Sequence, residues 1–276
     1  MRSRGVKVAR RIAQTGVARS MDSLCASYRS LYARLTRPRG LEENGEAALV
    51  RASLDAFTPR SKGDRPVLFD VGANVGDWSE LAVGSAELHL FEMAEASLQT
   101  LHEKFSLRDD VVVNNFALGN QEGFTEYKDY GDFSGKNTLV SEAEFYEGGK
   151  PKTCSVSTGD AYIERKALHG VHLLKIDVEG FELPVLEGFE KSLEYGYVNI
   201  IQFEYGFNNG EAHHLMMDFF EFLAPKGYRI GRLHPDGVRF HSYHSRLNNF
   251  DSGPNYVAAR HEFVDRLEVF TNSITS

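Results

Sequence analysis

Residues 67–79 read VLFDVGANVGDWS: a short apolar run, then a glycine-spaced turn, then the start of a helical segment. A short apolar run bounded by turn residues is typical of a buried strand. Gly72 and Gly76 allow the backbone to turn tightly and to approach a ligand, and the helix start offers unpaired N–H donors. In an open α/β sheet, a ligand binds just outside the carboxyl end of such a strand. This stretch therefore predicts a strand, a ligand-binding turn and a helix.

Short apolar runs alternate with helical segments over most of the chain. Strands are expected at 67–71, 88–92, 111–115, 173–176, 198–204, 228–233 and 256–260. Helical segments are expected at 41–57, 78–84, 95–105, 159–169, 181–194 and 211–224. This alternation predicts an α/β fold with a mostly parallel, seven-stranded sheet and helices on both faces. The last two strands have no helix between them, so we expect them to form a hairpin-like edge.

The spacing of the glycines favours one class of cofactor over another. It is G-x-x-x-G and not the G-x-G-x-x-G of dinucleotide sites, where the backbone must come close to a pyrophosphate. A ligand without phosphates can instead be held through an ammonium group by an acid such as Asp70, and S-adenosylmethionine has such a group. Glu92 ends the next strand, where a carboxylate can accept hydrogen bonds from both ribose hydroxyls. That feature also suits NAD, so a nicotinamide-dependent oxidoreductase remains an alternative.

Three motifs together resemble the FkbM family of S-adenosylmethionine-dependent methyltransferases. They are Phe69–Gly76, then Ala117–Gly119 followed by Gly123, and, most specifically, the run LKIDVEGFELPVLEG at 174–188. The resemblance covers about residues 65–260. It implies a Rossmann-like class I methyltransferase fold, S-adenosyl-L-methionine as cofactor, and O-methylation of a hydroxyl, often on a sugar of a polysaccharide, glycolipid or polyketide. The cofactor-binding residues expected from these motifs are Asp70, Gly72, Ala73, Asn74, Gly76, Glu92 and Ala117.

Two positions depart from the family pattern. Met93 follows the acid of the second strand, where the family commonly has proline, and it touches the adenosine pocket only marginally. Residues 158–160 read Thr-Gly-Asp, where a Leu-Asp-Asp-type turn is common. Neither departure affects a residue expected to take part in catalysis.

Acidic residues at the ends of the fourth and fifth main strands are the candidates for catalysis. Methyl transfer is an in-line displacement at a sulfonium, and a sugar hydroxyl gains from a base that removes its proton. Asp177 is the first candidate for that base. Glu179 either shares this role or caps the helix that begins near Gly180. Glu204 ends the fifth strand and His213 follows it, so both are also predicted to act on the substrate.

Lys175 precedes these acids by two residues and is expected to pair with Asp177 or Glu204. Asp177, Glu204 and His213 are also the residues that would hold a divalent cation. Hard oxygen-rich sites usually need more carboxylates than this, so no metal is predicted.

Residues 121–157 lose the helical period, which predicts loops and short strands between the third and fourth main strands. Loops beside strand ends commonly carry specificity. Aromatic rings suit the C–H face of a sugar, and amides suit its hydroxyls. The candidates for sugar contact are Tyr127, Tyr130, Phe133, Asn137, Thr138 and Tyr146.

The formal charge of −8 is divided unevenly along the 276 residues. Residues 1–40 hold ten basic residues and one acid, a net of +9, which leaves −17 for residues 41–276. An acidic body argues against nucleic acid as a partner, because such binding depends on a basic surface. The sequence thus divides into a basic N-terminal extension, 1–40, and a methyltransferase domain, 41–276.

The extension is expected to be an amphipathic helix, because its apolar residues recur every three or four positions. They are Val17, Met21, Leu24, Tyr28, Leu31 and Leu35. The helix could pack on the body, act as a targeting presequence, dock on a partner or lie on an anionic membrane. A non-catalytic docking protein that keeps the fold is therefore a further alternative to an enzyme.

No apolar run is long enough to span a membrane, and the two cysteines form neither a disulfide framework nor a zinc motif. We expect a cytoplasmic protein that could contact the membrane peripherally. The sequence does not constrain its oligomeric state.

Overall fold

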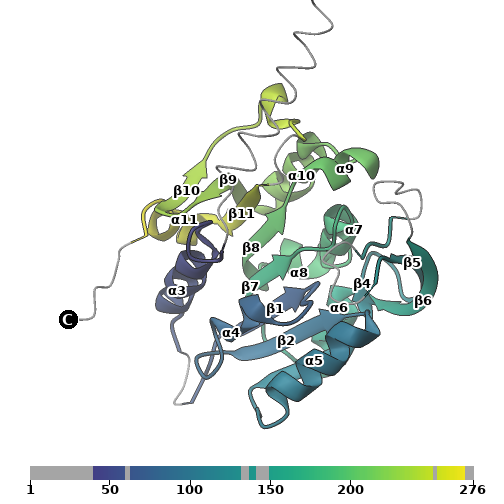
Figure 1. Cartoon of the computed structure of the whole chain (residues 1–276). Coiled ribbons are helices and arrows are strands. Elements are labelled where there is room, and N and C mark those ends of the chain that lie inside the picture. The colour runs from purple at the N-terminus through teal and green to yellow at the C-terminus, as the bar shows by residue number, and fades with distance from the viewer. Residues whose placement is uncertain (1–39, 60–62, 132–136, 141–148, 251–253, 271–276) are drawn as a thin grey trace, which may run out of the picture. The chain divides into compact units, whose positions relative to one another are not determined.

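The computed structural model describes residues 40–59, 63–131, 137–140, 149–250 and 254–270. Its main sheet is built from β1 (Val67–Val71), β2 (Glu87–Glu92), β3 (Val111–Asn115), β7 (Val171–Ile176), β8 (Val198–Glu204), β9 (Tyr228–His234), β10 (Gly237–Phe240) and β11 (Asn255–Arg260). The strand order is β10-β9-β11-β8-β7-β1-β2-β3 (Figure 1). The predicted α/β fold is therefore confirmed, with one more strand than expected.

Five neighbouring strands, from β3 to β8, are parallel, and the three at the other edge are antiparallel. The last two predicted strands do pair with each other, but β11 lies between β8 and β9, and the edge hairpin joins β9 to β10. The sequence missed β10 because this strand has four residues, too few to show a clear period.

Helices cover both faces of the sheet (Figure 1). The helices on one face are α3 (Glu46–Ala56), α4 (Asp77–Glu80), α5 (Glu95–Phe105) and α11 (His261–Leu267). Those on the other face are α6 (Gly159–Lys166), α7 (Glu182–Glu187), α8 (Glu190–Glu194) and α10 (Met216–Leu223). Successive side chains of a strand point to opposite faces, so Leu68 packs with the first group and Phe69 with the second. This two-sided burial explains the continuous apolar runs of the central strands.

Two predicted helices are interrupted in the structure. The segment 181–194 forms α7 and α8. Gly188 between them lies against the backbone of Gly119, where an added Cβ would come within 2.0 Å of the carbonyl oxygen, and its own carbonyl accepts the N–H of Asp160 at 2.9 Å. The segment 211–224 is divided between α9 (Phe207–Glu211) and α10. His213 lies in the turn between them with a left-handed φ of 60°. It therefore does not lie at the start of a helix, as the sequence had suggested.

The segment after β3 contains the predicted short strands. β4 (Ala117–Leu118), β5 (Gly123–Asp129) and β6 (Lys150–Ser157) form a second sheet in the order β4-β6-β5. A bridge between Lys128 and Thr138 places residues 137–140 beside β5. This small sheet brings the insertion to the carboxyl end of the main sheet.

The predicted amphipathic helix at 1–40 lies outside the described residues, apart from Gly40. Within the described ranges, the structure contains no helix with both the length and the apolar character needed to cross a membrane.

Candidate active site

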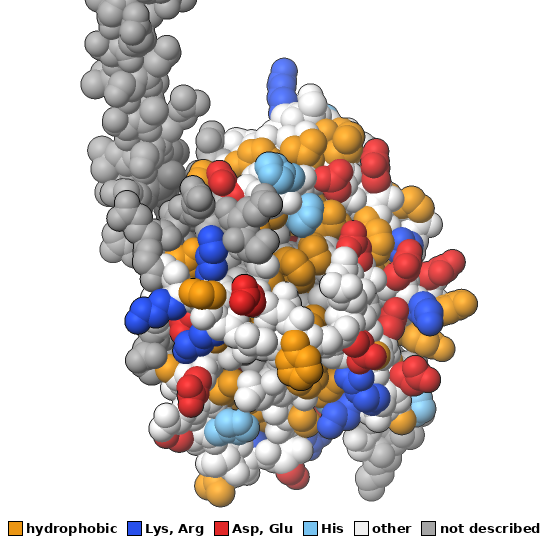
Figure 2. All heavy atoms as spheres, turned by 90° about the vertical axis from the view of Figure 1, so that its right-hand side faces the viewer, with side chains coloured by type: hydrophobic (Ala, Val, Ile, Leu, Met, Phe, Trp, Pro, Cys, Tyr) orange, Lys and Arg blue, Asp and Glu red, His pale blue; other side chains and the backbone are white. Residues whose placement is uncertain are grey.

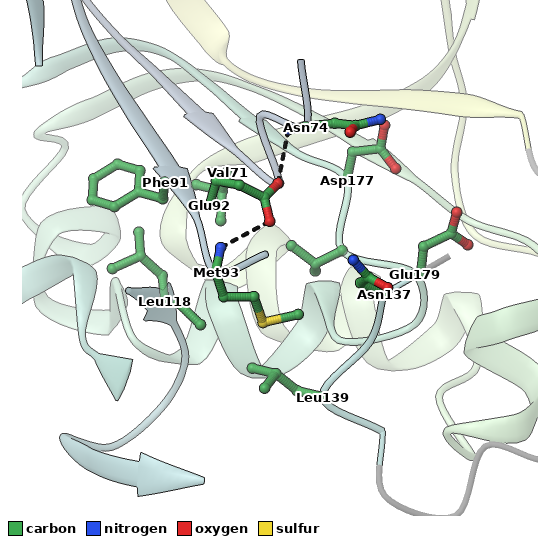
Figure 3. A pocket seen from close by; sticks show the side chains of 13 residues that line it. Val71, Asn74, Phe91, Glu92, Met93, Leu118, Asn137, Leu139, Asp177 and Glu179 are labelled. Carbon is green, nitrogen blue, oxygen red and sulfur yellow. Dashed lines mark hydrogen bonds between the residues drawn. The ribbon is translucent and has the colours of Figure 1, made fainter. Parts of the chain in front are cut away.

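A pocket lies at the carboxyl ends of β1, β2 and β7 (Figure 3). From β1 the chain continues through β2 and β3 toward one edge of the sheet, and from β7 it continues to β8 toward the other edge. The pocket therefore lies at the switch point where open α/β sheets bind ligands. The open space within the pocket, counted together with the solvent at its mouth, is about 550 Å³. It is lined by Val71, Gly72, Asn74, Phe91, Glu92, Met93, Ala117, Leu118, Asn137, Leu139, Asp177, Val178 and Glu179.

The turn after β1 is closed against both neighbouring strands. The N–H groups of Gly72 and Ala73 donate to the carbonyl of Phe91, at 3.0 and 3.1 Å. Gly72 has a φ of +80°, and a Cβ added to it would lie 1.9 Å from the carbonyl oxygen of Asp177. Only glycine therefore lets β1 and β7 approach each other at the base of the pocket.

Replacing Gly72 with alanine should destabilise the protein more than the same change at a glycine with open space around it. Gly227 is the matched control, because its φ is +88° but an added Cβ meets nothing within 4 Å. G227A should show only the cost of a left-handed alanine, about 1–2 kcal/mol. G72A adds a collision with backbone, so its unfolding free energy should fall by a further ~1–3 kcal/mol. Equal losses in urea denaturation would show that the close approach is not needed.

Glu92 faces the pocket from the end of β2 and is almost completely buried. One of its oxygens accepts the N–H groups of Met93 and Ala94, and the other accepts that of Asn74, all at 2.8 Å. Figure 3 shows the bonds from Asn74 and Met93. Burial raises the pKa of Glu92, although these backbone donors oppose the rise. A carboxylate has about four acceptor positions, so Oε2 has room for about one further bond. In this arrangement Glu92 suits one ribose hydroxyl better than the two expected from the sequence.

Apolar side chains form the wall beside Glu92. They are Phe91, Met93, Leu118 and Leu139. Met93 therefore forms part of the wall itself and not only a marginal contact, as the sequence had suggested (Figure 3). Such a wall suits the faces of an adenine ring, and Ala117 lies beside it as predicted. The sequence did not identify Leu139 as a wall residue, because nothing in residues 137–140 shows that this segment folds back over the pocket.

Asp177 and Glu179 lie on the opposite wall (Figure 3). The N–H of Asp177 donates to the carbonyl of Val71 at 3.0 Å, which continues the pairing of β7 with β1. Its carboxylate is 42% exposed and lies 3.5 Å from the ammonium group of Lys175. Glu179 has a left-handed φ of 54°, and its carbonyl accepts the hydroxyl of Thr138 at 2.8 Å. The structure thus places two carboxylates at the pocket, as predicted.

Asp70 is not placed as the sequence suggested. Its side chain is fully buried and does not line the pocket. The ammonium group that it holds belongs to Lys175, at 2.9 Å, and Ser79 donates a second hydrogen bond at 2.7 Å. Burial alone would lower the pKa of Lys175, but Asp70 and Asp177 outweigh it and raise that pKa. The direct contact predicted between Asp70 and the cofactor is therefore replaced by a buried ion pair beneath the pocket.

Four other predicted site residues also lie outside the pocket lining. Ala73 is buried. Gly76 caps the start of α4 with a φ of 80° and packs against α5, where an added Cβ would meet Leu101 and Phe105 at 2.8 Å. Glu204 is half-buried at the end of β8, and His213 is exposed.

The metal site considered from the sequence is not formed. Among the residues that the structure describes, no three His, Cys, Asp or Glu side chains are grouped closely enough to hold an ion. Asp177 therefore lies at the pocket without Glu204 and His213 as fellow ligands.

Of the residues predicted to contact a sugar, one lines the pocket and another is buried beside it. Asn137 lines the pocket, and Thr138 holds the carbonyl of Glu179. Tyr127 is buried. Phe133 and Tyr146 lie outside the described residues.

The fold and the pocket define an α/β protein with a ligand pocket at its switch point, lined by apolar side chains and carboxylates. The chain matches the methyltransferase FkbM domain over residues 70–230, and it belongs to this family. It is a methyltransferase that uses S-adenosylmethionine, and the nicotinamide alternative is thereby excluded.

Similar solved structures include methyltransferases of several kinds. A precorrin-6y C5,15-methyltransferase from Geobacter metallireducens is 13% identical, with 78% of this chain and 87% of that chain covered and a TM-score of 0.38. An rRNA methylase from Streptococcus thermophilus is 9% identical, with 76% and 92% covered and a TM-score of 0.39. A protein from Streptococcus mutans in complex with SAH is 9% identical, with 76% and 95% covered and a TM-score of 0.42. The chain matches no curated protein.

The residues of the pocket fit this cofactor. The apolar wall suits adenine, Glu92 suits a ribose hydroxyl, and Asp177 and Glu179 place negative charge where a ligand with a sulfonium and an ammonium group would lie. When bound, S-adenosylmethionine supplies a methyl group activated by a positively charged sulfur.

Proposed function

We propose that this methyltransferase transfers its methyl group to a hydroxyl, on a sugar of a glycan, glycolipid or glycosylated metabolite. One observation carries the proposal: Asp177 presents a partly exposed carboxylate to the same pocket that contains Glu92. A nitrogen or thiolate acceptor has a more reactive electron pair, whereas a hydroxyl benefits most from a positioned base.

Asp177 is the proposed general base. Asp177 would accept the proton of a hydroxyl held beside it, while bound S-adenosylmethionine would supply the methyl group and leave as S-adenosylhomocysteine. The ammonium group of Lys175 lies 3.5 Å from this carboxylate and helps to hold it in place. Glu179 shares the pocket, but its carboxylate is already bonded to the amide of Asn208, so we assign it to substrate contact.

A sugar acceptor is supported by the polar groups at the mouth of the pocket. Asn137 holds its carbonyl oxygen against the N–H of Tyr130 at 2.9 Å, and its side-chain N–H groups are donors of the kind that hydroxyls accept. On the face drawn in Figure 2, Lys and Arg side chains are interspersed with Asp and Glu. This mixture suits a neutral polyhydroxyl acceptor better than a phosphate polymer.

The test is transfer of a labelled methyl group from S-adenosylmethionine to a panel of nucleotide sugars and cell-surface glycans. We expect labelling of at least one sugar acceptor, and none of structured RNA or of protein. Labelling of RNA or protein alone would contradict the proposed acceptor class while leaving the methyltransferase assignment intact.

A further inference from the structure

Glu182, the first residue of α7, is a buried carboxylate that no step above uses. It is 1% exposed and does not line the pocket. Its oxygens accept the N–H of Val178 at 3.2 Å, the N–H of Gly180 at 3.1 Å and the side-chain amide of Asn209 at 2.5 Å. Every one of these partners is a donor, and two belong to the segment that carries the acids. We call residues 177–180 the acidic turn.

A second pair of side chains ties the acidic turn to α9. The amide of Asn208 donates to the carboxylate of Glu179, and the next residue, Asn209, donates to Glu182. Asn209 is itself held in place, because its carbonyl oxygen accepts the N–H of Gly206 at 2.7 Å. Two consecutive asparagines after β8 therefore hold two glutamates after β7.

The backbone of the acidic turn needs this support. Glu179 has a φ of 54°, a conformation that residues other than glycine seldom adopt, and Gly180 has a φ of 102°. An added Cβ on Gly180 would lie 2.7 Å from the carbonyl oxygen of Asn208, so the two turns are in close contact. Uncommon backbone conformations persist where the surrounding structure holds them.

The charge state of Glu182 decides whether its bonds can form. A carboxylate only accepts hydrogen bonds, so it matches three N–H donors, whereas a protonated carboxyl would turn an O–H donor toward them. Burial raises the pKa of Glu182 to about 7, and the charge of Asp177 adds to the rise. Three further titratable side chains lie beside or in the acidic turn: Glu179, His214 and Lys175. Gly180 contacts His214, whose pKa burial lowers, and the ammonium group of Lys175 lies 3.5 Å from the carboxylate of Asp177.

We infer that Glu182 is a positioning residue: as a carboxylate it holds Val178 and Glu179 in the shape that forms one wall of the cofactor pocket. Above neutral pH the wall is held, and as pH falls through about 7 the carboxyl takes up a proton, its bonds to Val178 and Gly180 weaken, and cofactor affinity falls. The inference depends on the pocket and its cofactor and does not depend on the acceptor.

Calorimetry with S-adenosylhomocysteine between about pH 5.5 and 8.5 tests the inference on the full chain. The affinity of the wild-type protein for S-adenosylhomocysteine should fall about tenfold as pH decreases through 7. Displacing a group beside a binding site commonly lowers affinity or activity by about ten- to a hundredfold. The glutamine side chain of E182Q has one acceptor oxygen in place of two. This variant should therefore bind S-adenosylhomocysteine about tenfold more weakly than wild type at pH 8, and its affinity should not change near pH 7. Glu187 lies exposed on the same helix, and E187Q is the control that should behave as wild type.

N209D gives a result that a merely structural role would not produce. A second carboxylate beside Glu182 raises its pKa further, so the change in affinity should move to higher pH. Thermal unfolding of each variant establishes that it is folded. If the variants do not fold, the amide resonances of Val178 and Gly180 in wild type should still titrate together near pH 7. Any of three results would overturn the inference. Wild-type affinity could stay constant through pH 7, the change in affinity near pH 7 could persist in E182Q, or the amide resonances of Val178 and Gly180 could fail to titrate.

Discussion

Replacing Asp177 with asparagine should lower methyl transfer by about 10²–10⁴-fold, the usual contribution of a positioned base. Asparagine keeps the shape of the side chain but cannot take the hydroxyl proton. The Asp177 carboxylate is 42% exposed, and the buried ammonium group of Lys175 beside it keeps Asp70 as a partner. The change therefore leaves no buried charge without a partner. Glu179 keeps a negative charge on the same wall of the pocket, so affinity for S-adenosylhomocysteine should fall by no more than a few-fold, and most of the loss should fall on kcat.

The control for this variant is D109N, which makes the same chemical change at an exposed position after α5. Single-turnover rates with labelled donor separate chemistry from product release. Full turnover of D177N with normal cofactor binding would remove Asp177 as the base. Glu179 would then be the next carboxylate to examine, because it lines the same pocket.

Replacing Lys175 with methionine should destabilise the protein by about 3–5 kcal/mol, the usual cost of removing one partner from a buried ion pair. Lys175 is 6% exposed and Asp70 is 0% exposed, and their charged atoms lie 2.9 Å apart. The methionine would leave the Asp70 carboxylate buried, and among the residues that the structure describes only the Ser79 hydroxyl would still be bonded to it. Urea denaturation measures the loss, and K191M, at an exposed lysine on α8, should change stability little.

The double variant K175M/D70N distinguishes a charge effect from a packing effect. Removing both charges leaves no uncompensated ion, so the double variant should recover a large part of the stability lost by K175M. A loss below about 1 kcal/mol in K175M, or additive losses in the double variant, would contradict the assigned ion pair.

The sequence predicted most of the strands because their surroundings are simple. β1, β7 and β8 are buried on both faces, so their residues form apolar runs bounded by turns. The interruptions were missed because they depend on tertiary contact. Gly188 ends α7 against a glycine 69 positions earlier in the chain, and His213 adopts a left-handed turn that no local rule requires.

The site was predicted where function depends on position along one strand, and misassigned where it depends on pairing between strands. Glu92, Asp177 and Gly72 lie at strand ends, which the sequence marks directly. Asp70 also lies near a strand end, but it stands beside Lys175 in the register of β1 with β7. These strands are about 100 residues apart, so no local pattern shows that this lysine neutralises that acid.

Glu182 was missed for a related reason. It belongs to the most specific motif in the chain. The sequence pattern favours the acids before it as functional residues, because they directly follow a strand. Its role depends on Asn209, 27 residues later, and on burial that only the folded protein shows.

The central claim, methylation of a sugar hydroxyl, is tested most directly by locating the transferred carbon. A labelled acceptor prepared with a ¹³C-methyl donor would be analysed by NMR for correlation between the new methyl group and a ring carbon through oxygen. We predict a methyl ether on one sugar carbon, formed by wild type and D109N and lost with D177N. A label bound to nitrogen or carbon, or an ether formed equally by D177N, would contradict it.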